Sequence, residues 1–261
     1  MTPQTTDEKS RSGTGEPVGQ ASTEATLRRV SPPGEDIPPD DSEQALRALY
    51  AHRPGVLRLG MIRSRDGRAA GPDGSSRSLG GPADLRVLHT LRSVADVVLV
   101  GAQTARRERY SDIALPDALA AARSSLRYRQ PHLAIVTRSG ILPPGLDPST
   151  TWVVTVAGSR AAALGGPWAS RVIEVGGTDI SPRTLVRELN SRGLTRVLCE
   201  GGPTLATRML SRGLVDEYCL TTADVEGAET AKQIPEVPAA MKLAHQLSGG
   251  EFTIERWTAS R

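Results

Sequence analysis

The chain has 261 residues, of which 38% are hydrophobic, 23% are charged and only 3% are aromatic. This composition is typical of a globular protein with an aliphatic core, and it excludes a broad surface of stacking aromatics such as single-strand nucleic-acid binders use. No run of about 18 apolar residues occurs, so no membrane span is expected. The first residues also lack the charged-then-apolar pattern of an export signal, so we expect a cytoplasmic protein.

Cys199 and Cys219 both lie in apolar runs, which predicts buried free thiols of a reducing compartment. These two residues cannot form a Cys-x-x-Cys zinc site, and the four histidines are scattered without metal-ligand spacing. We therefore expect no bound metal.

The net charge of +3 conceals an asymmetry along the chain. Residues 1–41 carry eight acidic and four basic side chains, a net of −4, so the remaining residues carry +7. Nearly all of this positive charge is arginine. It suits nucleic acid, a phosphorylated substrate or a phosphorylated cofactor, and a general arginine bias is the simpler alternative.

Residues 1–41 are rich in Thr, Ser, Gly, Pro and Glu and are predicted to be a disordered tail, whereas residues 42–261 are expected to form one domain. Within that domain the pattern predicts alternating helices and strands. Helices are expected over 41–51 with Ser42 as N-cap, 82–94, 115–128, 182–189 and 203–210, and a helical turn over 159–164. Strands are expected over 56–62, 96–100, 132–136, 152–156, 172–175, 196–199 and 216–221, followed by a hairpin of 241–247 and 252–257. This order predicts an α/β fold with a mainly parallel central sheet, helices on both faces and a C-terminal antiparallel hairpin.

Three predicted strand ends combine glycine or hydroxyl side chains in positions suited to anions. They are Gly101 to Thr104, Thr137 to Gly140, and Glu200 to Thr204, where Gly201 and Gly202 precede a helix that begins at Pro203. Glycine allows close approach of a backbone to phosphate, and free N–H groups at a helix start attract anions. Together these ends could hold a dinucleotide, and Arg138 could select a 2′-phosphate on adenosine. None matches Gly-x-Gly-x-x-Gly, so the usual dinucleotide-binding fold is excluded, and ordinary strand–helix turns remain the alternative for any single one.

Five segments occur in an order that is specific as a set. They are Ser64 to Ala70, Leu91-Arg92 before 96–100, Val100 to Thr104, Glu200 to Leu205, and Gly213 to Glu217. Over about residues 54–261 the chain resembles the pyrimidine reductase domain of riboflavin biosynthesis, within the dihydrofolate reductase-like superfamily.

The resemblance implies hydride transfer from NADPH to 5-amino-6-(5-phosphoribosylamino)uracil, whose sugar becomes a ribityl chain. It assigns Ser76, Arg92 and Glu200 to the substrate side. It assigns Ser78, Thr104, Glu108, Gly202, Pro203, Thr204 and Leu205 to the cofactor side, although Ser78 and Glu108 replace the more usual tryptophan and aspartate. The strand-end chemistry described above adds Gly101, Thr137, Arg138 and Gly201 to the cofactor set.

Two carboxylates are candidates for a catalytic role, because a hydride acceptor that develops negative charge needs a proton or a positive neighbour. Glu200 follows a buried strand, and Asp66 precedes Gly67 in the first long loop. For Asp66 the alternative is simple turn chemistry, since Asp-Gly is a favourable turn pair. Asp216 and Glu217 are interpreted as structural.

The chain also departs from the family pattern in two segments that bear on the substrate phosphate. Asp112 to Leu115 replaces a Leu-Thr-x-Arg stretch whose arginine helps to hold the substrate phosphate, and Leu59 and Gly60 occupy a region that often contains a lysine. Arg106, Arg107 and Arg109 are the nearby residues that could compensate for the lost positive charge. The His-x-Glu and Pro-Cys-x-x-Cys motifs of a partner deaminase domain are also absent from the sequence.

These departures leave two other functions open. A dihydrofolate or pterin reductase would act on an unphosphorylated planar substrate, and a regulatory protein would bind NADPH without turnover. A nucleic-acid module is disfavoured, because the positive charge accompanies neither a basic helix nor an aromatic platform. We expect a homodimer that acts on a small pyrimidine or pteridine.

Overall fold

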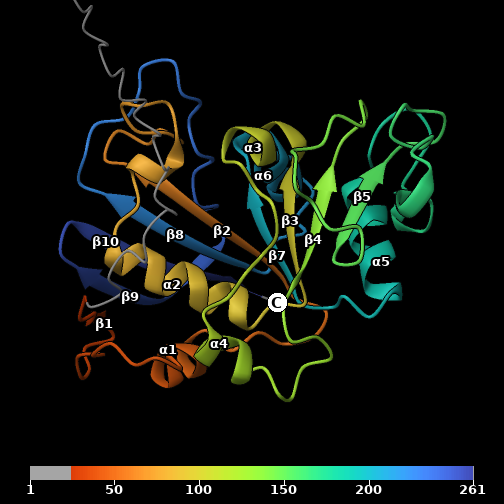
Figure 1. Cartoon of the computed structure of the whole chain (residues 1–261). Helices are drawn as coiled ribbons and strands as arrows, with labels where there is room; N and C mark the ends of the chain where they lie inside the picture. The colour runs from red at the N-terminus through yellow and green to blue at the C-terminus, as the bar shows by residue number, and fades with distance from the viewer. Residues whose placement is uncertain (1–24, 261) are drawn as a thin grey trace, which may run out of the picture.

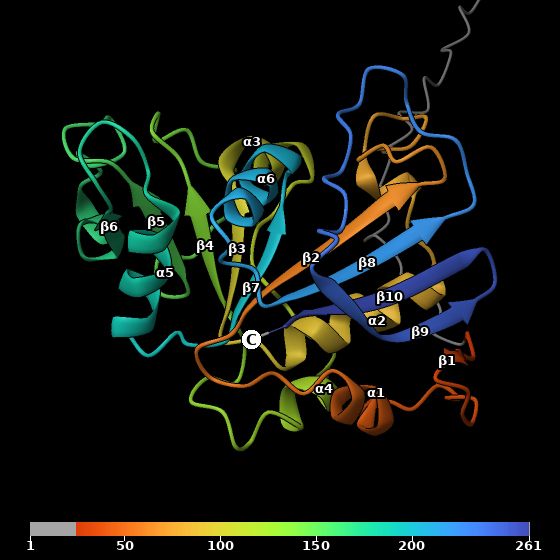
Figure 2. The same ribbon diagram turned by 180° about the vertical axis from the view of Figure 1, so that it is seen from behind.

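The computed structural model describes residues 25–260, and these residues are organised around one ten-stranded sheet (Figures 1 and 2). Its strand order is β1-β9-β10-β8-β2-β7-β3-β4-β5-β6. The strands are β1 (Arg28–Ser31), β2 (Leu57–Ser64), β3 (Val97–Gly101), β4 (His132–Val136), β5 (Thr151–Thr155), β6 (Val172–Glu174), β7 (Val197–Gly201), β8 (Glu217–Ala223), β9 (Met241–Gly249) and β10 (Phe252–Ala259). All pairings from β8 to β6 are parallel, whereas β10, β9 and β1 add antiparallel strands at the other edge.

Helices cover both faces of this sheet. They are α1 (Gln44–Leu49), α2 (Pro82–Ser93), α3 (Ala102–Arg107), α4 (Asp117–Ala121), α5 (Pro182–Ser191) and α6 (Pro203–Ser211), with short 3₁₀ turns at η1 (Ser76–Ser78) and η2 (Gly166–Arg171). Strand β3 shows how the two cores separate: Val97 and Leu99 pack with α5 and α6, whereas Val98 and Val100 pack with α1, α2 and α3. Because both faces are covered, the strand is apolar at every position rather than at alternate ones.

The expected α/β architecture is therefore confirmed, including the parallel sheet, helices on both faces and the C-terminal hairpin. The predicted helix over 115–128 is wrong in extent, since only Asp117–Ala121 is helical and turns follow. Helix α3 was not expected, because its six residues are too few to show an apolar period. Ser42 is not the cap of α1; instead the Asp40 carboxylate accepts a hydrogen bond of 2.8 Å from the Gln44 backbone N–H.

The prediction of a disordered tail over residues 1–41 is wrong for the second half of that range. Residues 1–24 lie outside the described part of the chain, but strand β1 pairs with β9, and Leu27 is fully buried beside Ile37. Arg86 of α2 fixes this segment by donating to the carbonyl oxygens of Ile37 at 3.2 Å and Pro38 at 2.9 Å, and it also binds the Glu43 carboxylate at 2.6 and 2.7 Å. The N-terminal boundary of the fold therefore precedes residue 41. The few apolar residues of this segment are spaced too widely in a polar sequence to predict a strand.

Several arginines that contribute to the positive charge are structural. Arg58 is fully buried and donates to Glu217 at 2.7 Å, and Arg256 donates to the other carboxylate oxygen at 2.7 Å. Arg123 donates to the Ser93 and Ala95 carbonyl oxygens, where α2 ends, so it satisfies acceptors that the helix leaves open. The structural interpretation of Glu217 is confirmed by these contacts, and these three guanidinium groups are committed within the fold.

Within residues 25–260 no helix is long and apolar enough to cross a membrane. Both cysteines, Cys199 and Cys219, are free and buried, and burial raises the pKa of the Cys199 thiol to about 12. Both thiols are therefore protonated and unreactive at neutral pH.

Candidate functional site

The carboxyl ends of β3 and β7 lie side by side and lead directly into α3 and α6, at the top of Figure 1. The β7–α6 connection consists of Gly201, with φ of 83°, and Gly202, joined by a cis peptide bond. The Thr104 hydroxyl of α3 accepts a hydrogen bond of 3.1 Å from the Gly202 N–H. Two strand ends that are about one hundred residues apart in sequence are thus joined into one surface, at the place where parallel α/β sheets bind ligands.

A first cavity lies between α2 and the sheet strands β2, β7 and β8. Positions 84, 88, 91 and 92 of α2 face it, at the spacing of one helical face. Its remaining walls come from the sheet, the β7–α6 turn and the α3 region. Residues that line it include Gly60, Ile62, Ser76, Asp84, Leu88, Arg92, Thr104, Arg107, Tyr110, Glu200, Gly202, Cys219, Thr221 and Ile254.

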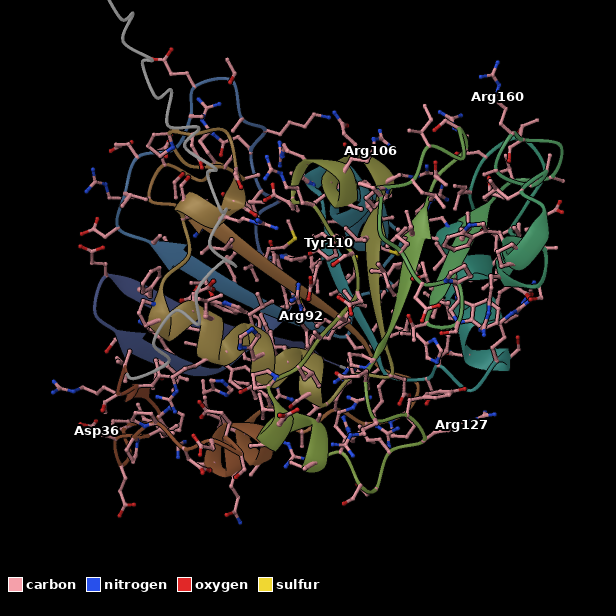
Figure 3. All side chains as sticks on the ribbon, viewed as in Figure 1. Asp36, Arg92, Arg106, Tyr110, Arg127 and Arg160 are labelled. Atoms are coloured by element: carbon pink, nitrogen blue, oxygen red, sulfur yellow. The ribbon has the colours of Figure 1, made fainter. Side chains whose placement is uncertain are left out.

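Glu200 is held at the edge of this cavity by two side chains. Arg92 donates from Nε to Oε1 and from Nη2 to Oε2, both at 2.7 Å, which is the bidentate geometry of a strong guanidinium–carboxylate pair. The Tyr110 hydroxyl donates to Oε2 at 2.5 Å. Figure 3 shows Arg92 and Tyr110 together near the centre of the molecule, whereas Arg127 and Arg160 lie at its periphery.

Burial and charge act together on this cluster. Burial lowers the pKa of the Arg92 guanidinium, but the charge and hydrogen bonds of Glu200 outweigh burial and raise it overall. Burial, followed by the Glu200 charge, raises the pKa of Tyr110 well above its usual value. At neutral pH the cluster is therefore a neutralised ion pair with a protonated phenol as an additional donor.

A second cavity lies outside the carboxyl ends of β3, β4 and β7. Its walls combine small residues, hydroxyls and basic side chains. Residues that line it include Gly101, Gln103, Thr104, Arg106, Arg107, Thr137, Arg138, Ser139, Asp179, Gly202, Pro203, Thr204, Leu205, Arg208 and Lys232. The start of α6 presents its free N–H groups here, and a Cβ on Gly202 would collide with the Thr104 hydroxyl. This set fits an extended anionic ligand such as a dinucleotide.

The two cavities share one wall. Ala69, Thr104, Arg107, Gly202 and Pro203 line both of them. A ligand in the second cavity can therefore reach a ligand in the first across the Gly202 turn, which is the arrangement that direct transfer between two molecules requires.

The structure brings together most of the predicted site residues. Ser76, Arg92 and Glu200 line the first cavity. Gly101, Thr104, Thr137, Arg138, Gly202, Pro203, Thr204 and Leu205 line the second, and Gly201 lies in the turn beside them.

Three predicted site residues lie elsewhere. Asp66 lines neither cavity and instead accepts hydrogen bonds from Ser64 Oγ at 2.5 Å and from the Gly227 N–H at 2.8 Å. Ser78 is exposed and donates to Asp73 Oδ1.

The third, Glu108, is buried and accepts from Ser75 Oγ at 2.7 Å and from the Ser76 N–H at 3.4 Å. It therefore holds the loop that carries Ser76. In the described structure each of these three side chains hydrogen-bonds to loop residues, which for Asp66 and Glu108 include residues distant in sequence.

The sequence reasoning missed Tyr110, Asp84 and Thr221. Asp84 had the signal of an acidic residue in the first turn of a helix, which ordinarily indicates capping. Tyr110 and Thr221 had no local signal, because only the folded sheet places them beside Glu200 and Asp84. Of the arginines that we considered as compensation, Arg107 lines the first cavity, whereas Arg106 lines only the second and Arg109 lines neither.

Residues 56–236 match the family model of the RibD C-terminal domain. The 2,5-diamino-6-ribosylamino-4(3H)-pyrimidinone 5′-phosphate reductase of Methanothermobacter thermautotrophicus is 28% identical over 186 residues, which cover 68% of this chain and 82% of that protein. The riboflavin biosynthesis protein RibD of Mycobacterium tuberculosis is 32% identical over 162 residues, covering 62% of this chain but only 40% of that protein.

Among solved structures, a pyrimidine reductase-like protein of Corynebacterium diphtheriae aligns with a TM-score of 0.66 and 26% identity, over 80% of this chain and 92% of that one. The family match covers the second cavity, the glycine turn and every lining residue of the first cavity except Ile254. The chain belongs to the RibD C-terminal domain family.

Proposed function

We propose that this chain is an NADPH-dependent reductase of the riboflavin pathway. It reduces the sugar of a 5-amino-6-(phosphoribosylamino)pyrimidine, for which the sequence suggested the uracil, to the ribitylamino product. The observation that carries the proposal is the wall shared by the two cavities, with Thr104 and Gly202 on both sides of it. A reductase needs this juxtaposition, because the donor and acceptor of a hydride must come into contact.

The second cavity is the proposed cofactor site. Thr104, Gly202 and the start of α6 suit the phosphates, and Arg138 at the carboxyl end of β4 suits a 2′-phosphate. When bound, a reduced nicotinamide supplies the hydride. The protein contributes the close approach of backbone to ligand that Gly202 permits.

The first cavity is the proposed substrate site. Glu200 is immobilised by Arg92 and Tyr110, so its position is set before a substrate enters. Preorganised polar groups stabilise developing charge without reorganising during the reaction. We assign Glu200 and Arg92 to substrate orientation. We assign Ser76, which lines the same cavity from the η1 turn, to substrate binding.

Steady-state oxidation of NADPH with each candidate substrate tests the proposal. We expect turnover with a phosphoribosylaminopyrimidine and none with dihydrofolate. Turnover of dihydrofolate alone would assign a pterin reductase, and tight NADPH binding without turnover of any substrate would assign a regulatory role. A homodimer and a cytoplasmic location remain predictions, and light scattering after size exclusion tests the first of them.

A further inference from the structure

Asp84 is an ionisable group of the first cavity to which the proposed reaction assigns no role. It lies in the first turn of α2, two turns before Arg92, and both side chains face the cavity. Thr221 of β8 lines the same cavity, so its hydroxyl is a further polar group beside the Asp84 carboxyl. Neither Asp84 nor Thr221 lines the second cavity, so the pair lies away from the wall shared with the proposed cofactor site.

The two ends of the first cavity differ in charge. Arg92 and Glu200 neutralise each other, which leaves Asp84 and Arg107 as the other charged groups of the lining. Arg107 belongs to the shared wall, and among residues 25–260 no cation pairs with Asp84. A substrate with a phosphate at one end and a neutral ring at the other is therefore oriented with its ring toward Asp84, because the phosphate would be repelled there.

The hydrogen-bonding capacity of the Asp84 carboxylate then distinguishes between the two candidate pyrimidine rings. A carboxylate offers two acceptors and no donor. The N3–H and 2-amino group of a 2-aminopyrimidin-4-one present two adjacent donors, which a carboxylate can accept together. The corresponding uracil edge replaces the amino group with a carbonyl oxygen, which would face a carboxylate oxygen without a proton between them. Burial raises the pKa of Asp84 to about 6, so the carboxylate form still predominates at neutral pH.

We propose that Asp84, with Thr221 beside it, recognises the 2-amino edge of the pyrimidine, so that the preferred substrate is the 2,5-diamino-6-ribosylamino-pyrimidinone phosphate rather than the uracil. This inference rests on the proposed function and deepens it. It assigns a specificity-determining residue and revises the uracil that the sequence suggested.

The test compares kcat/KM for the two substrates in the wild-type protein and in Asp84→Asn. The wild-type protein should favour the diaminopyrimidinone by roughly 10- to 100-fold, the usual effect of one mismatched buried polar contact. An asparagine offers one acceptor and one donor, which match the uracil edge. Asp84→Asn should therefore lower kcat/KM for the diaminopyrimidinone, raise it for the uracil, and narrow or invert the preference.

Asp117→Asn is the matched control, because Asp117 is an exposed first-turn aspartate of α4 that lines neither cavity. It should leave the preference unchanged. Competitive inhibition by the ring fragments 2,5,6-triaminopyrimidin-4-one and 5,6-diaminouracil gives a second readout, since these lack the sugar and the phosphate.

Each outcome separates the two proposals. A wild-type protein that reduces both substrates equally, or prefers the uracil, overturns the inference and leaves the reductase assignment intact. Equal losses on both substrates in Asp84→Asn also overturn it, since a helix cap would act in that way. A wild-type protein that reduces neither substrate overturns the proposed function itself. If Asp84→Asn does not fold, two measurements still test the inference. They are the substrate preference of the wild-type protein and that of Thr221→Val, in which the preference for the diaminopyrimidinone should be weaker.

Discussion

Arg92 and Glu200 are 108 positions apart in the sequence and are joined by two parallel hydrogen bonds of 2.7 Å. Arg92 comes from the last turn of α2, and Glu200 comes from the carboxyl end of β7. Their pairing connects the helix that covers the first cavity to the turn that separates the two cavities. The geometry of the proposed active site therefore depends on how α2 lies against the sheet.

Replacement of Arg92 by lysine should lower kcat/KM by about 10- to 100-fold, because an ammonium cannot make two parallel bonds to one carboxylate. Steady-state kinetics measures the effect. Arg187→Lys on the exposed part of α5 is the matched control and should leave kcat/KM unchanged. Unchanged kcat/KM in Arg92→Lys would show that charge alone suffices.

Replacement of Tyr110 by phenylalanine removes the hydroxyl that donates to Glu200 at 2.5 Å. A hydrogen bond to a charged group contributes about 1.5–3 kcal/mol, so the free energy of unfolding should fall by a comparable amount in urea titrations. Tyr128→Phe serves as the control, since the ring of Tyr128 packs edge-on against His132 outside both cavities. Equal stability of the two variants would contradict a stabilising role for the Tyr110 hydroxyl.

Replacement of Gly202 by alanine should abolish NADPH binding, because the added Cβ collides with the Thr104 hydroxyl inside the shared wall. Calorimetric titration with NADPH measures the loss. Gly165→Ala is a suitable comparison, since a Cβ there meets nothing within 4 Å. Retained affinity in Gly202→Ala would place the cofactor elsewhere.

Replacement of Arg138 by alanine should raise KM for NADPH by about 10-fold or more and leave KM for NADH unchanged, because only NADPH has the 2′-phosphate. Arg160→Ala removes an arginine at the periphery of the molecule and should affect neither cofactor (Figure 3). If both cofactors weaken equally in Arg138→Ala, the arginine contacts a group that they share.

The raised pKa of Asp84 predicts a pH dependence of stability. Burial raises it from 3.8 to about 6, with the Thr221 hydroxyl and Arg92 opposing the shift and Glu200 adding to it. Between about pH 4 and pH 6 the folded protein therefore binds more protons at this site than the unfolded chain, so the free energy of unfolding falls as pH rises through this window.

The loss from this single site is at most about 3 kcal/mol. Asp84→Asn should flatten the curve over the same range in urea titrations. An identical slope in both proteins would contradict the raised pKa.

The strands that build the site could be read from the sequence because they are buried on both faces. Val97 to Val100 is apolar at every position, and such a run bounded by Gly101 predicts a central strand. The Gly201–Gly202 turn before Pro203 could also be predicted, since glycine favours turns and proline favours the first position of a helix. The short helix α3 and strand β1 were missed, because four to six residues do not show a period.

The sequence by itself determined the parallel sheet, the glycine turn and Glu200 as the carboxylate beside it, because these depend on local backbone preference and on apolar runs. Only the tertiary structure decided which polar groups meet in the cavity. Tyr110, Asp84 and Thr221 come from a loop, a helix and a distant strand, and their side chains converge because α2 packs against β2, β7 and β8. Asp66 had the better local signal, yet its carboxylate lies outside both cavities, where it accepts hydrogen bonds from Ser64 of its own turn and from the Gly227 N–H of a loop distant in sequence. Local sequence specifies which backbone conformations are favourable, whereas the distances between side chains are set by packing across the sheet.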